Sequence, residues 1–151
     1  MRRLPLPFLF LCVLPLMAAP DFSGSWKINK LKSDFGPMPP PDSLTMTIDH
    51  KDPKLTVVNK QSRDGNEFES TSNYTTDGKE CVNEFRGNSR KSTLKWEGET
   101  LVTVSKAKLG ENDITITEKW VLSGEGKVLT ISRHIVTPRG ESDTKMTLDK
   151  Q

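Results

Sequence analysis

The feature of this sequence that most constrains its fold is the alternation of apolar and polar residues in short runs from residue 44 onward. Leu44, Met46 and Ile48 alternate with polar residues, and Leu129 and Ile131 do the same. A period of two is typical of a strand with one buried face. In the same region, apolar residues do not recur at spacings of three and four over a dozen positions. The pattern therefore predicts an all-β protein.

Turn signals separate these runs at short and even spacing. The chain offers Asp-Pro, Asp-Gly and Gly-x pairs at 52–53, 64–65, 77–78, 97–98, 110–112, 124–126 and 138–140, and such pairs suit tight hairpins. These connections are too short for a crossover helix, so neighbouring strands must be antiparallel. We predict a meander of about eight to ten strands that closes into a barrel, because closure removes exposed edges. The Pro-rich segment 32–43 is expected to be a loop.

The first 19 residues resemble a secretory signal peptide. Arg2 and Arg3 precede an apolar run over residues 4–17, and the small residues Ala18 and Ala19 follow, an order typical of such signals. We expect cleavage between Ala18 and Ala19, a barrel domain over 20–151, and a secreted or periplasmic protein without stable membrane insertion. The alternative is an uncleaved membrane anchor. Cys12 lacks the small preceding residues of a lipoprotein cysteine, so no lipid anchor is predicted.

The charge balance bears on the class of partner. The chain has 22 Lys and Arg residues against 20 Asp and Glu, and loss of Arg2 and Arg3 makes the two counts equal. A neutral domain lacks the basic face that nucleic acid requires, so we expect no nucleic-acid partner. Cys81 is the one cysteine beyond the leader, so the fold must be stabilised by core packing rather than by an internal disulfide.

The mature chain opens on Gly24-Ser25-Trp26, directly before the meander. This Gly-x-Trp motif at the start of a secreted up-and-down barrel resembles the calycins, the superfamily of lipocalins and fatty-acid-binding proteins. The resemblance implies that Trp26 plugs the closed end of the barrel, with a basic side chain packed over its ring as a cation–π contact. Arg133 is the expected partner, and Lys145 is the second choice.

Two features depart from that superfamily. Fatty-acid-binding proteins have a helix pair between their first two strands, where this chain has the Pro-rich loop. They also hold the ligand carboxylate with an Arg-x-Tyr on the last strand, which here reads DTKMTLDK. The resemblance therefore does not carry a fatty-acid site over to this chain.

One pair of charges falls on the apolar side of the predicted strands. If Leu122 pairs with Leu129 across the turn at 124–127, then Glu118 faces Arg133. Unpaired inward charges are costly, so an ion pair is expected. The pair either anchors the head group of a ligand or serves as a structural ion pair near the end of the barrel.

The face that carries Phe68 and Tyr74 also carries Ser70 and Ser72. Small interior side chains leave room for a ligand in a barrel of this size. We therefore predict ligand contacts from Phe68, Tyr74, Trp120, Arg133 and Glu118. The alternative is that Phe35 and Met38 fold in from the Pro-rich loop and fill the space.

Motifs for catalysis, metal binding or cofactor binding were also sought. His50 and His134 lack the spacing of metal ligands and are expected at the surface, and Cys81 is expected to be a small buried hydrophobe. We expect a non-enzymatic protein without a metal or cofactor, which binds a small hydrophobic or amphipathic molecule inside the barrel. The alternative is an envelope module with a filled barrel. Ligand identity and oligomeric state are not predicted.

Overall fold

A computed structural model describes residues 18–151 of the chain. Most of the predicted signal peptide, with Arg2, Arg3 and Cys12, lies outside the described residues. Residues 18–151 form ten antiparallel strands and one 3-10 turn, η1 (Lys30–Lys32). This confirms the predicted all-β meander. The strands are β1 (Gly24–Ile28), β2 (Ser43–Lys51), β3 (Lys54–Arg63), β4 (Asn66–Thr75), β5 (Asp77–Phe85), β6 (Asn88–Glu97), β7 (Thr100–Leu109), β8 (Asn112–Ser123), β9 (Val128–Thr137) and β10 (Gly140–Lys150).

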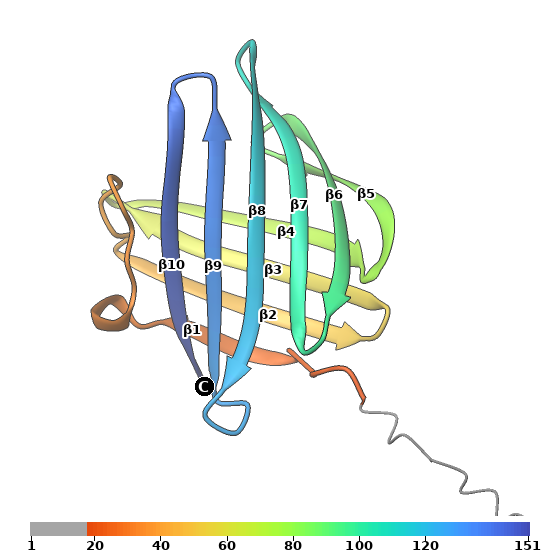
Figure 1. Ribbon diagram of the computed structural model, residues 1–151. Helices are drawn as coiled ribbons and strands as arrows, with labels where there is room; N and C mark the ends of the chain where they lie inside the picture. The colour runs from red at the N-terminus through yellow and green to blue at the C-terminus, as the bar shows by residue number, and fades with distance from the viewer. Residues whose placement is uncertain (1–17) are drawn as a thin grey trace, which may run out of the picture.

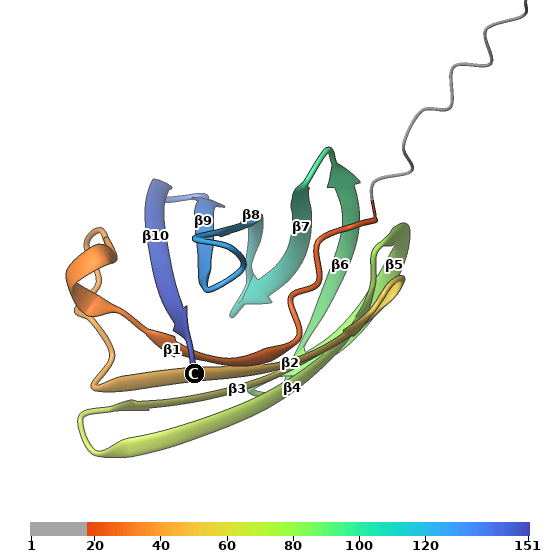
Figure 2. The same ribbon diagram turned by 90° about the horizontal axis from the view of Figure 1, so that it is seen from below.

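The strands form one sheet that curls into a nearly closed barrel. The sheet order is β4-β3-β2-β1-β10-β9-β8-β7-β6-β5, and pairing of β1 with β10, such as Trp26 with Lys150, joins the two ends of the chain. Strands β1 to β4 run crosswise behind strands β7 to β10, so that the barrel consists of two layers facing each other (Figures 1 and 2). The Pro-rich segment is the loop between β1 and β2, as predicted.

The barrel is left open along one line, the boundary between β4 and β5, which we call the seam. These two strands are consecutive in the chain but form the two edges of the described sheet. Side chains replace part of the missing ladder. The Asn83 amide accepts a hydrogen bond from the Asn73 N–H at 2.8 Å and donates one to the Asn73 carbonyl at 3.0 Å. Cys81, expected as a buried hydrophobe, is partly exposed, and its Sγ accepts the Thr75 N–H at 3.2 Å.

One half of the barrel, which we call the closed half, is filled by aromatic and aliphatic side chains. Phe22 and Trp26 are fully buried. The Phe22 ring stacks on Trp96 with centroids 5.7 Å apart, and it meets Trp120 edge-on at 5.8 Å. Aromatic side chains of this size each bury about 150–250 Å². The remaining core residues of this cluster are aliphatic and include Leu55, Leu94, Leu101, Leu129 and Leu148.

The Gly-x-Trp motif has a local explanation in this half. Trp26 Nε1 donates a hydrogen bond to the Phe22 carbonyl at 2.9 Å. Gly24 has a φ of +137°, and a Cβ at this position would lie 2.7 Å from Cε of Lys150. Glycine therefore supplies both the backbone conformation and the space in which the Lys150 side chain crosses β1. The Lys150 ammonium lies 5.3 Å from the centroid of the Trp26 ring.

The expected cation over Trp26 was wrong. The structure places Lys150 there, rather than Arg133 or Lys145. Arg133 faces the interior as predicted, but it lies farther along β9, where Glu118 binds it. Lys145 is held in an isolated bridge to Asp34 of the Pro-rich loop.

The expectation of a surface position for His50 was also wrong, because only 6% of this residue is exposed. Residues 21–23 fold back over the end of β2 and cover it. The Phe22 N–H donates to Nδ1 of His50 at 3.2 Å, and the Ser23 hydroxyl donates to its carbonyl at 3.0 Å. His134 lies on the outer face, as expected, where Nδ1 is 2.8 Å from Asp143.

In the part of the chain that the structure describes, no helix has the length and apolar character needed to cross a membrane.

Candidate ligand cavity

The other half of the barrel, the open half, contains a cavity of about 460 Å³. It lies between the Pro-rich loop and the β5–β6 turn, above the filled closed half. The apolar part of its lining includes Phe35, Met38, Phe68, Phe85, Ile116 and Met146. The polar part includes Asn59, Gln61, Arg63, Arg86, Arg90 and Arg133. A pocket with this mixture of apolar walls and a few polar groups is typical of a small-molecule site.

Arg133 of β9 lines this cavity, and Glu118 of β8 forms an ion pair with it without lining the cavity itself. The predicted β8–β9 register is confirmed, since Leu122 pairs with Leu129 and Glu118 pairs with Arg133. Glu118 Oε1 accepts a hydrogen bond from Nε of Arg133 at 2.7 Å and forms an ion pair with Nη2 at 2.6 Å, and Trp120 Nε1 donates to Oε2 at 3.1 Å. These contacts neutralise the charge of Arg133 and orient its guanidinium.

The ionisation of Glu118 follows from the same contacts. Burial raises the pKa of this carboxyl, but the charge of Arg133 and the hydrogen bonds from Trp120 and Arg133 lower it. The lowering causes together outweigh burial, so the pKa of Glu118 lies below its ordinary value. Glu118 is therefore an anion at neutral pH, and Arg133 keeps its partner.

The structure divides the five predicted ligand residues into two groups. Phe68 and Arg133 line the cavity. Glu118 bonds to Arg133 but does not line the cavity, and Trp120 packs in the closed half with 5% of its surface exposed. Tyr74 packs beside the core on β4, and burial raises the pKa of its hydroxyl. Whether any of the five contacts a ligand stays a prediction.

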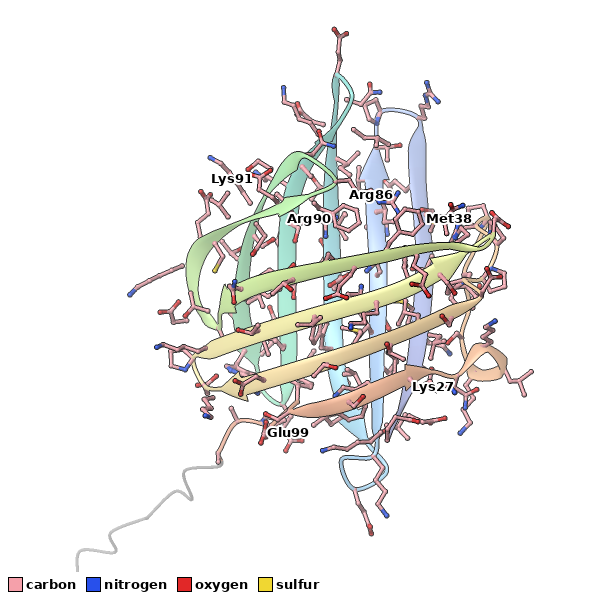
Figure 3. The ribbon with its side chains drawn as sticks, turned by 180° about the vertical axis from the view of Figure 1, so that it is seen from behind. Lys27, Met38, Arg86, Arg90, Lys91 and Glu99 are labelled. Atoms are coloured by element: carbon pink, nitrogen blue, oxygen red, sulfur yellow. The ribbon has the colours of Figure 1, made fainter. Side chains whose placement is uncertain are left out.

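Phe35 and Met38 line the cavity without filling it. Phe35 packs against the core, and Met38, with 43% of its surface exposed, lies in the Pro-rich loop on the rim of the cavity (Figure 3). The alternative of a filled barrel therefore describes the closed half alone.

The lining residues that sequence reasoning missed include Phe85, Arg86 and Arg90. Figure 3 shows Arg86 and Arg90 near each other beyond the free edge of β4. The Arg86 guanidinium carbon lies 4.3 Å from the Phe68 ring centroid and 5.4 Å from that of Phe85, and the Arg90 guanidinium carbon lies 5.0 Å from the Phe85 ring centroid. Arg90 could have been found, because it shares the parity of Leu94 and Trp96 on one strand. Arg86 is a turn residue, for which parity gives no direction.

The search for metal ligands covered the described residues. In residues 18–151, no group of three or more His, Cys, Asp or Glu side chains is arranged to hold a metal ion.

Comparisons with known proteins define the class of this fold. Neither a family model nor a curated protein sequence matches the chain. Solved structures do match. The zebrafish ileal bile acid-binding protein complexed with cholic acid is 18% identical with a TM-score of 0.61, over 86% of this chain and 98% of that one. A secretory abundant heat soluble protein from Ramazzottius varieornatus is 13% identical with a TM-score of 0.61, over 85% and 94%.

A third similar structure is human cRBP IV, which is 14% identical with a TM-score of 0.55 over 87% of this chain and 99% of that one. These likenesses extend over nearly the whole of each compared chain. They confirm the resemblance to the calycins at the level of the fold. The chain therefore shares the fold of these structures and forms a ten-stranded, nearly closed antiparallel barrel.

Proposed function

We propose that the protein is a secreted or periplasmic binding protein that holds one small amphipathic molecule in the open half of its barrel. The observation that carries this proposal is the cavity of about 460 Å³, which has apolar residues and arginines in one lining. An apolar body would pack against Phe35, Ile116 and Met146, and a polar head would meet the arginines. The similar structure with cholic acid supports the proposal, since there an amphipathic molecule is in complex with the same type of barrel.

Native mass spectrometry of the purified protein tests whether a molecule is retained. A mass above that of the polypeptide, lost on unfolding, is expected. Titration with the neutral dye N-phenyl-1-naphthylamine then tests the location. We expect dye fluorescence to rise on binding, and we expect Met146→Trp to reduce the rise because the larger side chain occupies part of the cavity.

Val121→Trp is the matched control, because Val121 lies on the outer face of β8 and is 39% exposed. It should leave dye binding unchanged. Equal binding by both variants would place the dye outside the cavity, and no binding by the parent protein would favour the alternative, an envelope module that works through its outer surface. Intact mass of the exported protein tests the proposed location and the cleavage before Ala19.

A further inference from the structure

The cavity carries more positive than negative charge. Four arginines line it, at positions 63, 86, 90 and 133, with Asp64 as the acidic residue of the lining. Within residues 18–151, Arg133 is the only one of the four that forms an ion pair, and its partner is Glu118. Arg86 and Arg90 therefore present guanidinium groups to the cavity with no carboxylate bound to them.

Arg90 also has an unmet hydrogen-bond donor. Its Nε is buried and has no hydrogen-bond partner among the described residues. A buried donor without an acceptor is costly, and a bond from a guanidinium to an anionic oxygen is among the stronger hydrogen bonds in proteins. A small rotation of the Arg90 side chain toward an oxyanion in the cavity would satisfy this group.

The two guanidiniums and two phenyl rings form an alternating cluster across the seam. Phe68 projects from β4, Phe85 from β5, and Arg86 lies over both rings, while Arg90 lies over Phe85. The two rings are 39% and 37% exposed. Arg86 has a φ of +49° in the turn before Gly87, a conformation that glycine favours. The turn thus places a bulky residue where it contacts the ring on the opposite strand.

The space beside this cluster ends at the filled closed half of the barrel. Phe22, Trp26 and Trp120 fill the closed half below it. A long alkyl chain would need an apolar channel along the barrel axis, whereas the polar side chains Asn59, Gln61 and Thr144 also line this cavity. A compact, flat molecule fits these surroundings better, because both faces of a conjugated ring can stack on phenyl or guanidinium planes.

We propose that the cluster of Phe68, Phe85, Arg86 and Arg90 is a site for a planar conjugated anion, an aromatic ring system that carries a carboxylate or a similar oxyanion. The oxyanion accepts hydrogen bonds from the guanidinium groups of Arg90 and Arg86, and the ring packs against the phenyl groups. This inference rests on the proposed function, and it names the class of ligand.

Isothermal titration calorimetry with three probes of eleven carbons tests the proposal: 2-naphthoate, undecanoate and neutral 2-naphthalenemethanol. We expect 2-naphthoate to bind at least about tenfold more tightly than either of the others, because it alone combines charge with a flat ring. Arg90→Gln should weaken 2-naphthoate by about tenfold. Arg86→Lys keeps the charge and loses the plane, so it should weaken 2-naphthoate while undecanoate changes by less than about twofold.

Arg139→Lys is the control, because Arg139 is an exposed residue of the β9–β10 turn, and it should change nothing. Circular dichroism checks the fold of each variant, and Arg86→Lys alone decides the matter if Arg90→Gln does not fold. Equal or tighter binding of undecanoate, or 2-naphthoate binding that is indifferent to Arg86→Lys, overturns the inference and leaves the proposed function standing. Failure of all three probes and of N-phenyl-1-naphthylamine overturns both.

Discussion

Removal of Arg133 should destabilise the protein by an amount set by how deeply its ion pair is buried. Arg133→Met leaves Glu118 with the single hydrogen bond from Trp120 Nε1. Loss of one partner costs about 3–5 kcal/mol for a fully buried pair and about 0–1 kcal/mol for an exposed one. The Glu118 side chain is 14% exposed and that of Arg133 is 30% exposed. We therefore expect a loss of about 2–3 kcal/mol, between the two limits.

A double-mutant cycle separates the pair from its surroundings. Glu118→Gln keeps an oxygen that accepts from Trp120 and Arg133, so it should cost less, about 1–2 kcal/mol. The double variant should be more stable than the sum of the two losses predicts, by at least about 1 kcal/mol. Urea unfolding, followed by tryptophan fluorescence, measures all four free energies. A coupling below about 0.3 kcal/mol would refute the interpretation of Glu118 and Arg133 as an inward ion pair.

The same pair predicts how stability depends on pH. The pKa of Glu118 is lowered in the folded protein, so the unfolded chain binds a proton at higher pH than the folded protein does. Its contribution is therefore complete above the unfolded pKa of about 4.3 and is lost as pH falls through the folded pKa. In Arg133→Met, burial still raises the pKa of Glu118, but the positive charge of Arg133 no longer lowers it. The pKa of Glu118 in the folded variant therefore rises. The loss of stability on acidification should then be smaller than in the parent protein, because it depends on the gap between the unfolded and the folded pKa of Glu118, and an unchanged profile would contradict this.

Three further predictions concern the closed half and the seam. Trp26→Ala should cost about 3–5 kcal/mol in urea unfolding and leave the affinity for N-phenyl-1-naphthylamine unchanged in the fraction that folds; a stable variant without dye binding would contradict the structural role of Trp26. Gly24→Ala should cost about 1–3 kcal/mol, because of its φ of +137°, whereas Gly65→Ala isolates the cost of a positive φ in open space. Asn83→Ala should speed hydrogen exchange of the Asn73 amide, because it removes the acceptor, and Asn88→Ala, at the exposed first residue of β6, should not; equal exchange rates would show that the seam does not depend on Asn83.

The sequence predicts local pairings better than distant ones. The β8–β9 register could be predicted, because a short turn links the strands and parity then fixes every pair up to Glu118 and Arg133. No short turn links β1 to β10, so the sequence does not fix their register. Parity tells which face of the sheet a side chain lies on, but not how far along the barrel it lies. For that reason Arg133 was expected over Trp26, while Lys150, across the ladder from Trp26, occupies that place.

The same limitation explains His50 and the missed residues of the cavity. A strand end is exposed unless another segment covers it, and the segment 21–23 that covers His50 lies 27 residues away in the chain. Arg86 lies in a turn, and the position of its side chain over Phe68 depends on how β4 and β5 approach each other without a ladder. The sequence alone does not specify that approach.

The division of the barrel into two halves can be followed along individual strands. The inward side chains of β3 change from Leu55 and Val57, which are buried, to Asn59, Gln61 and Arg63, which line the cavity. Strand β6 runs the other way and shows the reverse order, from Arg90 to buried Leu94. The two strands run in opposite directions, so their opposite orders of apolar and polar side chains match in space. The apolar side chains of both strands therefore lie at one end of the barrel.

This division predicts that the stability of the protein and its affinity for a ligand depend on different residues. The closed half supplies most of the buried apolar area, so substitutions there should lower the free energy of unfolding. Arg86 and Phe68 are well exposed at the mouth and contribute little to that core. Substitutions at Arg86 should therefore change ligand affinity with little change in stability, and those at Leu129 or Trp26 should do the opposite. If Arg86→Lys and Leu129→Ala instead reduced affinity and stability in the same proportion, the open half would be part of the core, and the cavity would have no separate role.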